Sequence, residues 1–174
     1  MVDSDNLILM TNDRINRSLK RMGHEIIERN KSDYPIALFG INQRGLAVAK
    51  ELGRVLSDII NHEVKVVPLN LEADSPAEEK WRERTYEKQH FIVLVDDVIF
   101  SGRTMFRALT ATVNQLEPAE IYTAVLIDRG HRKYPVKAEF YGMKLPTKLD
   151  EHVAVMVKKG KVQEVQLTYE GDVS

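Results

Sequence analysis

The sequence contains no cysteine, and neither sign of charge is in excess. Without cysteine, the chain can build neither a disulfide framework nor a thiolate metal site. Its 25 Lys and Arg residues are balanced by 26 Asp and Glu residues, so the formal net charge is −1. Binding of a nucleic acid would therefore need a local basic patch rather than the field of the whole molecule.

Long hydrophobic runs are missing as well. No apolar stretch approaches the roughly 20 residues that cross a membrane. The stretch 1–10 carries two aspartates and lacks the basic and long apolar regions of a signal peptide. We therefore expect a cytoplasmic protein with no membrane partner. The 174 residues, of which 43% are hydrophobic, suit one globular domain that covers residues 1–174.

Apolar periodicity predicts helices and strands in alternation, which is typical of an α/β fold with a mostly parallel sheet and right-handed crossovers. The charged stretch 72–90 lacks a clear period and is expected to form a surface loop or short hairpin. In the third predicted helix, the side chains expected to face inward are Met105, Leu109, Val113 and Leu116. The predicted helices cover residues 11–30, 44–60 and 103–116; the predicted strands cover residues 34–40, 63–71, 91–95, 121–127, 136–141, 153–157 and 162–169.

Three polar segments directly follow three of the predicted strands, at residues 40–45, 96–104 and 128–132. In an open parallel sheet, ligands bind outside the carboxyl ends of the strands. The topology therefore predicts that these segments meet in one site, although nothing in the linear sequence forces them together.

The middle segment places two carboxylates, Asp96 and Asp97, before a loop that suits a phosphate group. A strand-to-helix turn at Gly102 can expose consecutive backbone N–H groups, and the first turn of the next helix adds unpaired donors and a positive dipole. The hydroxyls of Ser101 and Thr104 can donate as well. Carboxylates accept hydrogen bonds from vicinal diols, so a sugar 5-phosphate fits both parts. The alternative is that the two aspartates only cap the following turn.

These residues carry a resemblance to a known family. The stretch "VLVDDVIFSGRT" (93–104) resembles the phosphoribosyl-pyrophosphate (PRPP) signature of type I phosphoribosyltransferases. Residues 24–30, 40–56 and 124–147, the last of which contains "DRGHR", extend the resemblance to a subfamily. That subfamily is the bifunctional pyrimidine operon regulator and uracil phosphoribosyltransferase.

The resemblance implies a type I phosphoribosyltransferase-like fold, in which helices flank a central, mostly parallel sheet and a small C-terminal β hood follows. The core would cover about residues 11–127, and the hood with the C-terminal β segment about residues 128–170. Members of the family transfer ribose 5-phosphate from PRPP to a base and release pyrophosphate. They assemble as dimers or larger, so a homo-oligomer is expected.

The resemblance also assigns roles to single residues. Asp96 and Asp97 would face the ribose hydroxyls, directly or through Mg2+, and Arg44 would be the cation for pyrophosphate. Mg2+ would bridge pyrophosphate and ribose oxygens. The implied groups are a 5-phosphate loop of Val98, Ile99, Phe100, Ser101, Gly102, Arg103 and Thr104; a pyrophosphate loop of Ile41, Asn42, Gln43, Arg44 and Gly45; and a base-binding hood of Asp128, Arg129, Gly130, His131 and Arg132.

The sequence differs from the family pattern at two places, and both differences bear on the expected function. Purine-using relatives usually carry an acid where this chain has Phe100, which favours a pyrimidine base or nucleotide, or no base; simple packing of the loop is the alternative. The subfamily closes a hairpin with a Tyr-Arg-Asp-Asp stretch over PRPP, and residues 69–90 lack that stretch. Without a lid, water exclusion and stabilisation of the leaving group weaken. Poor turnover with uracil is therefore an open alternative.

Three functions remain open at this stage. The first is an enzyme that makes UMP from uracil and PRPP. The second is a regulator that binds RNA and senses nucleotides in the PRPP site. The third is a catalytically retired homologue that still binds nucleotides. Basic residues that could contact RNA occur on the first predicted helix and between residues 129 and 137, although such charges usually serve only solubility.

Overall fold

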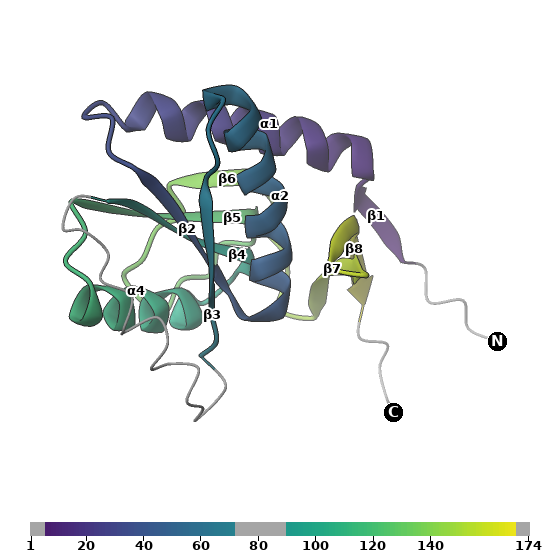
Figure 1. Cartoon of the computed structure of the whole chain (residues 1–174). Helices are drawn as coiled ribbons and strands as arrows, with labels where there is room; N and C mark the ends of the chain where they lie inside the picture. The colour runs from purple at the N-terminus through teal and green to yellow at the C-terminus, as the bar shows by residue number, and fades with distance from the viewer. Residues whose placement is uncertain (1–5, 72–89, 170–174) are drawn as a thin grey trace.

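Five parallel strands form the central sheet of the protein in the computed structural model, which describes residues 6–71 and 90–169 (Figure 1). Their order across the sheet is β3-β2-β4-β5-β6, so β4, which leads into the longest polar segment, lies between β2 and β5, which lead into the other two. Each neighbouring pair is parallel. The strands are β2 (Ile36–Ile41), β3 (Lys65–Leu69), β4 (Phe91–Ile99), β5 (Glu120–Asp128) and β6 (Phe140–Lys144).

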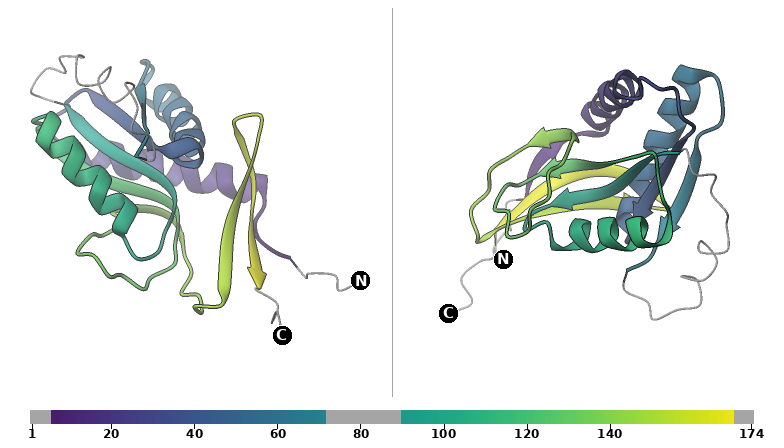
Figure 2. Two further views of the ribbon diagram at one scale, coloured as in Figure 1. Left: turned by 90° about the horizontal axis from the view of Figure 1, so that it is seen from below. Right: turned by 90° about the vertical axis from the view of Figure 1, so that its left-hand side faces the viewer.

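Helices cover both faces of this sheet. On one face lie α1 (Asn12–Arg29) and α2 (Asn42–Ile60), and on the other lies α4 (Arg103–Gln115), as the right-hand view of Figure 2 shows. Burial from both sides explains why the strands are continuous apolar runs rather than alternating ones. Residues 91–95 of β4 are all buried; Val93 packs in the core under α1 and α2, and Leu94 packs in the core under α4.

A second, antiparallel sheet stands to one side of the first, against α1 and α2 (Figure 2). Its order is β1-β8-β7, with β1 (Leu7–Met10), β7 (Glu151–Lys158) and β8 (Lys161–Tyr169). Lys159 and Gly160 join β7 to β8 with positive φ angles of 51° and 73°, which is the geometry of a two-residue hairpin turn. The predicted fold class, a parallel sheet flanked by helices with a small β unit, is confirmed.

The structure corrects several details of the prediction. Val113 does not face inward but is 47% exposed, because α4 turns Met105, Ala108 and Thr112 toward the sheet. Thr112 is tolerated there because its hydroxyl donates to Ala108 O at 2.8 Å. β4 does not end at residue 95 but continues through both aspartates to Ile99.

Two further observations concern the sheets and the charged stretch. The strand expected at 136–141 lies at Phe140–Lys144 and joins the central sheet, and the N-terminal β1, which was not predicted as a strand, joins the small sheet. The charged stretch expected to form a loop lies, apart from His90, outside the described residues. Within residues 6–71 and 90–169, no helix has the length and apolarity needed to cross a membrane.

Candidate functional site

The three polar segments meet at one edge of the central sheet, as the topology predicted. β2 and β5 lie on either side of β4, and all three strands run in the same direction. Gly40 of β2 pairs with Val95 of β4, and Ile99 of β4 pairs with Asp128 at the end of β5. The segments after residues 41, 99 and 128 therefore leave the sheet at the same edge.

Asp96 and Asp97 form an acid pair in the last part of β4. Both side chains are half-buried. Asp96 Oδ1 accepts a hydrogen bond from Asp97 N at 2.9 Å, and Asp97 Oδ1 accepts one from Val98 N at 2.8 Å. Burial raises the pKa of Asp96 well above its usual range, and the neighbouring charge of Asp97 raises that pKa further. A ligand with hydroxyl groups or a cation would relieve this unfavourable pairing of charges.

The start of α2 packs directly on this acid pair. A Cβ atom at Gly45 would lie 2.7 Å from Val95 O and 3.2 Å from Asp96 Oδ1, so only glycine allows the approach. Asn42 has a φ of 54°, a left-handed conformation that asparagine tolerates better than most residues, and its Oδ1 accepts from Leu71 N at 3.0 Å. The N-cap residue Ile41 offers no side-chain acceptor, so the first N–H groups of α2 remain open to a ligand.

The start of α4 is also uncapped. Its N-cap is Gly102, with a φ of 84°, and its first turn contains no acid. Arg103 N donates to Ser101 Oγ at 3.3 Å, and the side chains of Arg103 and Thr104 are exposed. Unpaired N–H groups and the helix dipole make this start a suitable place for a phosphate group. Val98 and Ile99 lie in β4 rather than in this loop, and their part in phosphate binding stays a prediction.

The segment after β5 is held mostly by internal contacts. The Arg129 side chain is only 8% exposed; it donates to Thr147 Oγ1 at 2.8 Å and to the carbonyl oxygen of Glu151. Burial lowers the pKa of Arg129 from its usual value. The Phe100 ring lies between Arg129, whose guanidinium carbon is 4.4 Å from the ring centre, and His131, whose ring is 5.2 Å away. Phe100 is thus packed, and its effect on the choice of base stays a prediction.

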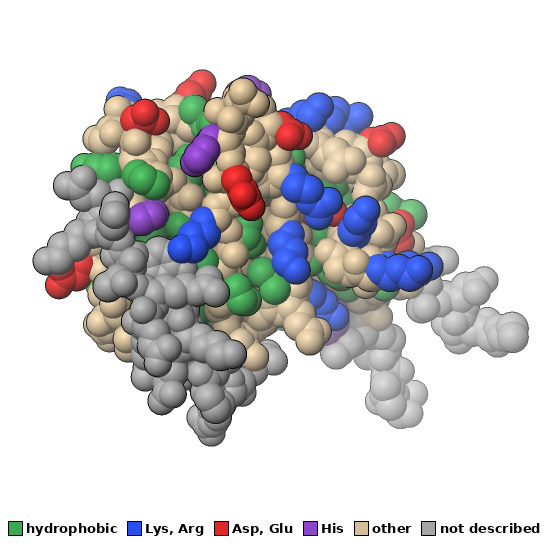
Figure 3. Space-filling view, in the orientation of Figure 1, with side chains coloured by type: hydrophobic (Ala, Val, Ile, Leu, Met, Phe, Trp, Pro, Cys, Tyr) green, Lys and Arg blue, Asp and Glu red, His purple; other side chains and the backbone are tan. Residues whose placement is uncertain are grey.

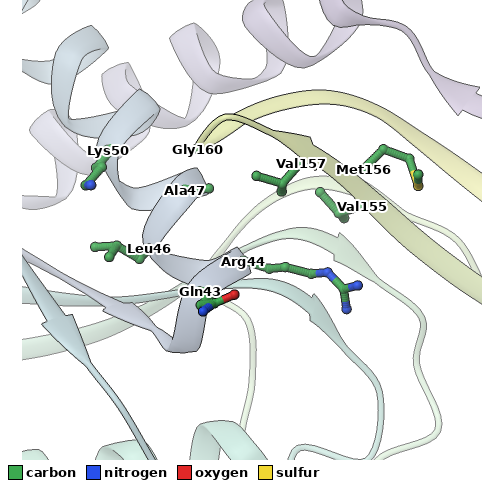
Figure 4. Close-up of a pocket in the computed structure, with 9 residues that line it drawn as sticks. All are labelled: Gln43, Arg44, Leu46, Ala47, Lys50, Val155, Met156, Val157 and Gly160. Atoms are coloured by element: carbon green, nitrogen blue, oxygen red, sulfur yellow. The ribbon is translucent and has the colours of Figure 1, made fainter.

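Arg44 lines a cavity of about 530 Å3 between α2 and the β7–β8 hairpin. Figure 4 shows its side chain extending from α2 toward Val155, beneath the hairpin. Gln43 and Lys50 also line the cavity, and Val155, Met156 and Val157 form its apolar wall. The sequence did not indicate that the C-terminal hairpin contributes to this site, because a strand of alternating residues carries no signal for its position beside a helix start.

Comparison with known proteins identifies the family of the chain. A family model described as "Phosphoribosyl transferase domain" matches residues 9–158, which include all three segments at the edge of the sheet. The chain belongs to the phosphoribosyltransferase family.

Relatives at higher identity place this phosphoribosyltransferase in the PyrR subfamily. It is 38% identical over 160 residues to the "Bifunctional protein PyrR" of Thermus aquaticus, which covers 87% of this chain and 88% of the relative. It is 37% identical over 161 residues to the protein of the same name in Clostridium novyi, covering 87% and 90% of the two chains. The resemblance first seen in single motifs thus extends over most of the chain.

Solved structures confirm the fold of this phosphoribosyltransferase. The HGPRT-ase of Leishmania tarentolae in complex with GMP superposes with a TM-score of 0.77 at 20% identity, covering 98% of this chain and all of that one. The hypoxanthine phosphoribosyltransferase of Trypanosoma cruzi gives a TM-score of 0.73 at 18% identity, covering 93% and 95%. At such identities the likeness concerns the fold and not the base that is used.

The donor atoms of the site fit Mg2+ only if a substrate shares in binding it. Carboxylate oxygens are the ligands that Mg2+ prefers, and the acid pair supplies two such groups side by side. Within the described parts of the chain, however, no group of three or more His, Asp or Glu side chains could hold a metal. The remaining ligands would have to come from phosphorylated substrate and water, as expected for an ion that arrives with PRPP.

Proposed function

We propose that the protein binds PRPP and transfers its ribose 5-phosphate to uracil, giving UMP and pyrophosphate. The observation that carries the proposal is the acid pair flanked by two uncapped helix starts, those of α2 and α4. Two helix starts suit the two phosphorylated ends of PRPP, and the carboxylates at the strand end suit the ribose hydroxyls that lie between those ends.

In this proposal the residues of the chain bind and orient the reactants. The start of α2 with Arg44 holds pyrophosphate in the cavity beneath the hairpin, and residues 100–104 hold the 5-phosphate. The ribose is then fixed between two anion sites, with Asp96 and Asp97 beside it. Their negative charge favours a ribose that becomes positive as the bond to pyrophosphate breaks. Mg2+, when bound, would neutralise the leaving pyrophosphate.

The choice of a pyrimidine rests on position 100 and on the subfamily resemblance. Phe100 cannot share a proton with a ring nitrogen, as an acid at this position would for a purine. Its ring instead contributes an apolar surface held by Arg129 and His131. Uracil is the base that this reasoning favours.

The test measures product formation from PRPP and Mg2+ with uracil, hypoxanthine or orotate in parallel. We expect UMP from uracil and no nucleotide from the other two bases. Product from hypoxanthine or orotate alone would refute the choice of uracil. In the same preparation, PRPP with Mg2+ should raise the melting temperature, and the double variant Asp96→Asn, Asp97→Asn should abolish that rise. An unchanged rise would show that the acid pair does not hold the ribose.

A second candidate function is an RNA-binding regulator that uses the PRPP site as a nucleotide sensor. Figure 3 shows Lys and Arg side chains gathered over α1, α2 and the β7–β8 hairpin, which pack against one another. The exposed cations of this basic face are Arg14, Arg17, Lys20, Lys50, Arg54, Lys158, Lys159 and Lys161. In the "DRGHR" segment, by contrast, the guanidinium groups of Arg129 and Arg132 are engaged with internal acceptors.

The RNA-binding candidate predicts a steep salt dependence. Binding of a structured leader transcript should weaken strongly as salt rises from 50 to 200 mM, with one unit of slope lost for each phosphate contact removed. Absence of any complex at low salt would exclude this function. A protein that binds PRPP but forms no product with any base, and binds no RNA, would be the catalytically retired homologue. A homo-oligomer and a cytoplasmic location remain predictions; size-exclusion chromatography with light scattering tests the first.

A further inference from the structure

The side chain of Arg132 makes three hydrogen bonds and one ion pair to acceptors around the phosphate loop. Its Nη1 donates to Phe100 O at 2.9 Å and to Gly130 O at 3.1 Å. Its Nε donates to Val136 O at 3.0 Å, and its Nη2 lies 2.9 Å from Asp128 Oδ2. A planar guanidinium can serve several fixed acceptors at once, whereas a lysine ammonium is a single point of charge. Arg132 therefore ties the phosphate loop to the segment that follows β5.

The backbone of residues 129–134 binds the same side of the loop. Arg129 N donates to Ile99 O at 3.0 Å, and Lys133 N donates to Ser101 O at 2.8 Å. With the bond from Arg132 to Phe100 O, three consecutive carbonyl groups of the loop are engaged. Carbonyl oxygens held on this side cannot face a bound anion, so the loop offers that anion N–H donors instead of repelling oxygens.

Arg132 also supports the N-cap of α4 through packing. A Cβ atom at Gly102 would lie 3.3 Å from Arg132 Cδ and 2.5 Å from Val136 Cγ1, so the aliphatic stem of Arg132 fills the space beside the left-handed turn. Asp128 belongs to the same arrangement, because its Oδ1 accepts from Gly130 N at 3.0 Å while its Oδ2 faces Arg132. Both oxygens of Asp128 are thus engaged within the protein.

We propose that Arg132 is a positioning residue for the 5-phosphate group of the ligand, and that it acts through the loop it braces rather than by contact with the base. The inference rests on the proposed function, since that function places the 5-phosphate at residues 100–104. It reassigns Arg132, which the sequence placed among the base-binding residues of the hood. The planar fork of the side chain, and not its charge alone, is the property that matters.

The test compares three proteins: wild type, Arg132→Lys, which keeps the charge and loses the fork, and Lys137→Ala, which removes a nearby exposed charge. Calorimetry measures binding of ribose 5-phosphate and, separately, of inorganic pyrophosphate with Mg2+. We expect Arg132→Lys to bind ribose 5-phosphate about tenfold or more weakly, as for the loss of one charge-assisted contact, and to bind pyrophosphate as wild type does. Lys137→Ala should match wild type with both ligands.

Deuterium exchange of the ligand-free proteins tests the brace directly. Backbone amides in the peptide covering residues 99–104 should exchange faster in Arg132→Lys than in wild type, and those of α1 should not change. Wild-type affinity for ribose 5-phosphate in Arg132→Lys, unchanged exchange, or an equal loss of pyrophosphate binding would each overturn the positioning role. A wild-type protein that binds no ribose 5-phosphate would instead overturn the proposed function, and the positioning role with it.

Should Arg132→Lys fail to fold, Asp128→Asn tests the same contacts by weakening the ion pair between Asp128 and Arg132. This variant leaves the guanidinium in place and removes the charge that fixes its Nη2. We expect a smaller loss of ribose 5-phosphate affinity in the same direction, again without loss of pyrophosphate binding. Unchanged affinity in this variant would also count against the brace.

Discussion

The start of α1 differs from the starts of α2 and α4. Thr11 caps α1, since its Oγ1 accepts from Arg14 N at 3.4 Å, and Asp13 places an acid in the first turn. The N-caps of α2 and α4 are Ile41 and Gly102, which have no side-chain acceptor, and neither first turn contains an acid. Every helix start leaves N–H groups without an intrahelical partner. In α1 the N-cap side chain accepts from one of them, whereas the N-cap residues of α2 and α4 accept from none, which in the proposed function leaves N–H groups for a ligand at the edge of the sheet.

In the proposed function, the start of α1 serves stability and the starts of α2 and α4 serve binding. This contrast also explains why the acid pair lies where it does: the carboxylates of Asp96 and Asp97 sit beside positive helix ends without being used as caps by them. If these carboxylates capped the following turn instead, less of their negative charge would be left for a ligand. A change at the start of α1 should therefore alter stability and leave binding unchanged, whereas a change at the start of α2 or α4 should weaken binding.

The largest expected effect comes from closing the space at the start of α2. In Gly45→Ala, the new methyl group would lie 2.7 Å from a backbone oxygen, Val95 O, so α2 or β4 must shift. We expect PRPP affinity to fall about 10- to 100-fold, in line with the roughly 1–3 kcal/mol of an overpacked site. Titration calorimetry with PRPP and Mg2+ measures the change.

Gly53→Ala on the same helix is the matched control for this variant. Its new Cβ would come 2.7 Å from a side-chain atom, Val66 Cγ2, rather than from the backbone of β4, and the site lies elsewhere. PRPP affinity should stay at the wild-type value. If both variants lost affinity equally, general damage to α2 and not the contact with the acid pair would be the cause.

The second effect comes from giving α4 the acid that α1 already has. Thr104→Asp places a negative charge in an exposed first-turn position. We expect the free protein to become about 0.5 kcal/mol more stable through the helix dipole, and PRPP affinity to fall about tenfold through repulsion of phosphate. Thermal unfolding and calorimetry measure the two quantities.

Thr104→Asn has nearly the same shape without the charge and is the control for that experiment. It removes the hydroxyl in the same way, so any difference between the two variants reports the charge. High salt should narrow the difference because it screens exposed charges. Equal affinity of the Asp and Asn variants at low salt would mean that no anion binds at the start of α4.

The sequence was sufficient to predict the order of elements and the meeting of the three segments. Parallel topology alone brings the ends of β2, β4 and β5 to one edge, and apolar runs such as residues 91–95 are strong signals. The continuation of β4 through Asp96 and Asp97 was missed because acids are depleted in strands. Here both carboxylates bind backbone N–H groups of the next residue, which a local pattern does not reveal.

The roles of the two arginines in the "DRGHR" segment could not be predicted from their surroundings in the sequence. Arg129 reaches Thr147 and Glu151, about twenty residues away along the chain, and Arg132 reaches back to Phe100. Such long-range contacts turn two cations that suggested a base- or RNA-binding surface into internal supports. Thr112 rather than Val113 faces the sheet for a similar reason. The sequence alone does not decide which of two adjacent residues of a helix is buried, and packing against the sheet does.

A third and smaller effect is expected at the start of α1. Thr11→Ala removes the side-chain acceptor of the cap and should lower the free energy of unfolding by about 0.5–1 kcal/mol, as is usual for a lost N-cap. PRPP affinity should not change, because this helix start faces no ligand in the proposal. Urea unfolding with and without PRPP measures both. A loss of PRPP affinity comparable to that of Thr104→Asp would erase the distinction between the two classes of helix start.

The smallest effect concerns a half-buried acid in the body of α2 rather than a helix start. Glu51 Oε1 accepts from Val162 N at 3.3 Å, while its Oε2 is buried without a hydrogen-bond partner in the described chain. Burial raises the pKa of Glu51, so the folded state holds its proton more tightly than the unfolded state does. Between the unfolded pKa, about 4, and the higher folded pKa, wild-type stability must therefore fall as pH rises.

Glu51→Gln should remove this pH dependence, because an amide keeps the acceptor for Val162 N and carries no charge. Since part of the side chain remains in contact with solvent, we expect a gain in unfolding free energy of only about 0.5 kcal/mol at pH 7, shrinking to nothing near pH 4. Urea unfolding at several pH values measures it, with the exposed Glu28→Gln as the control for net charge. A gain that was constant with pH would show that packing, and not ionisation of Glu51, separates the two proteins.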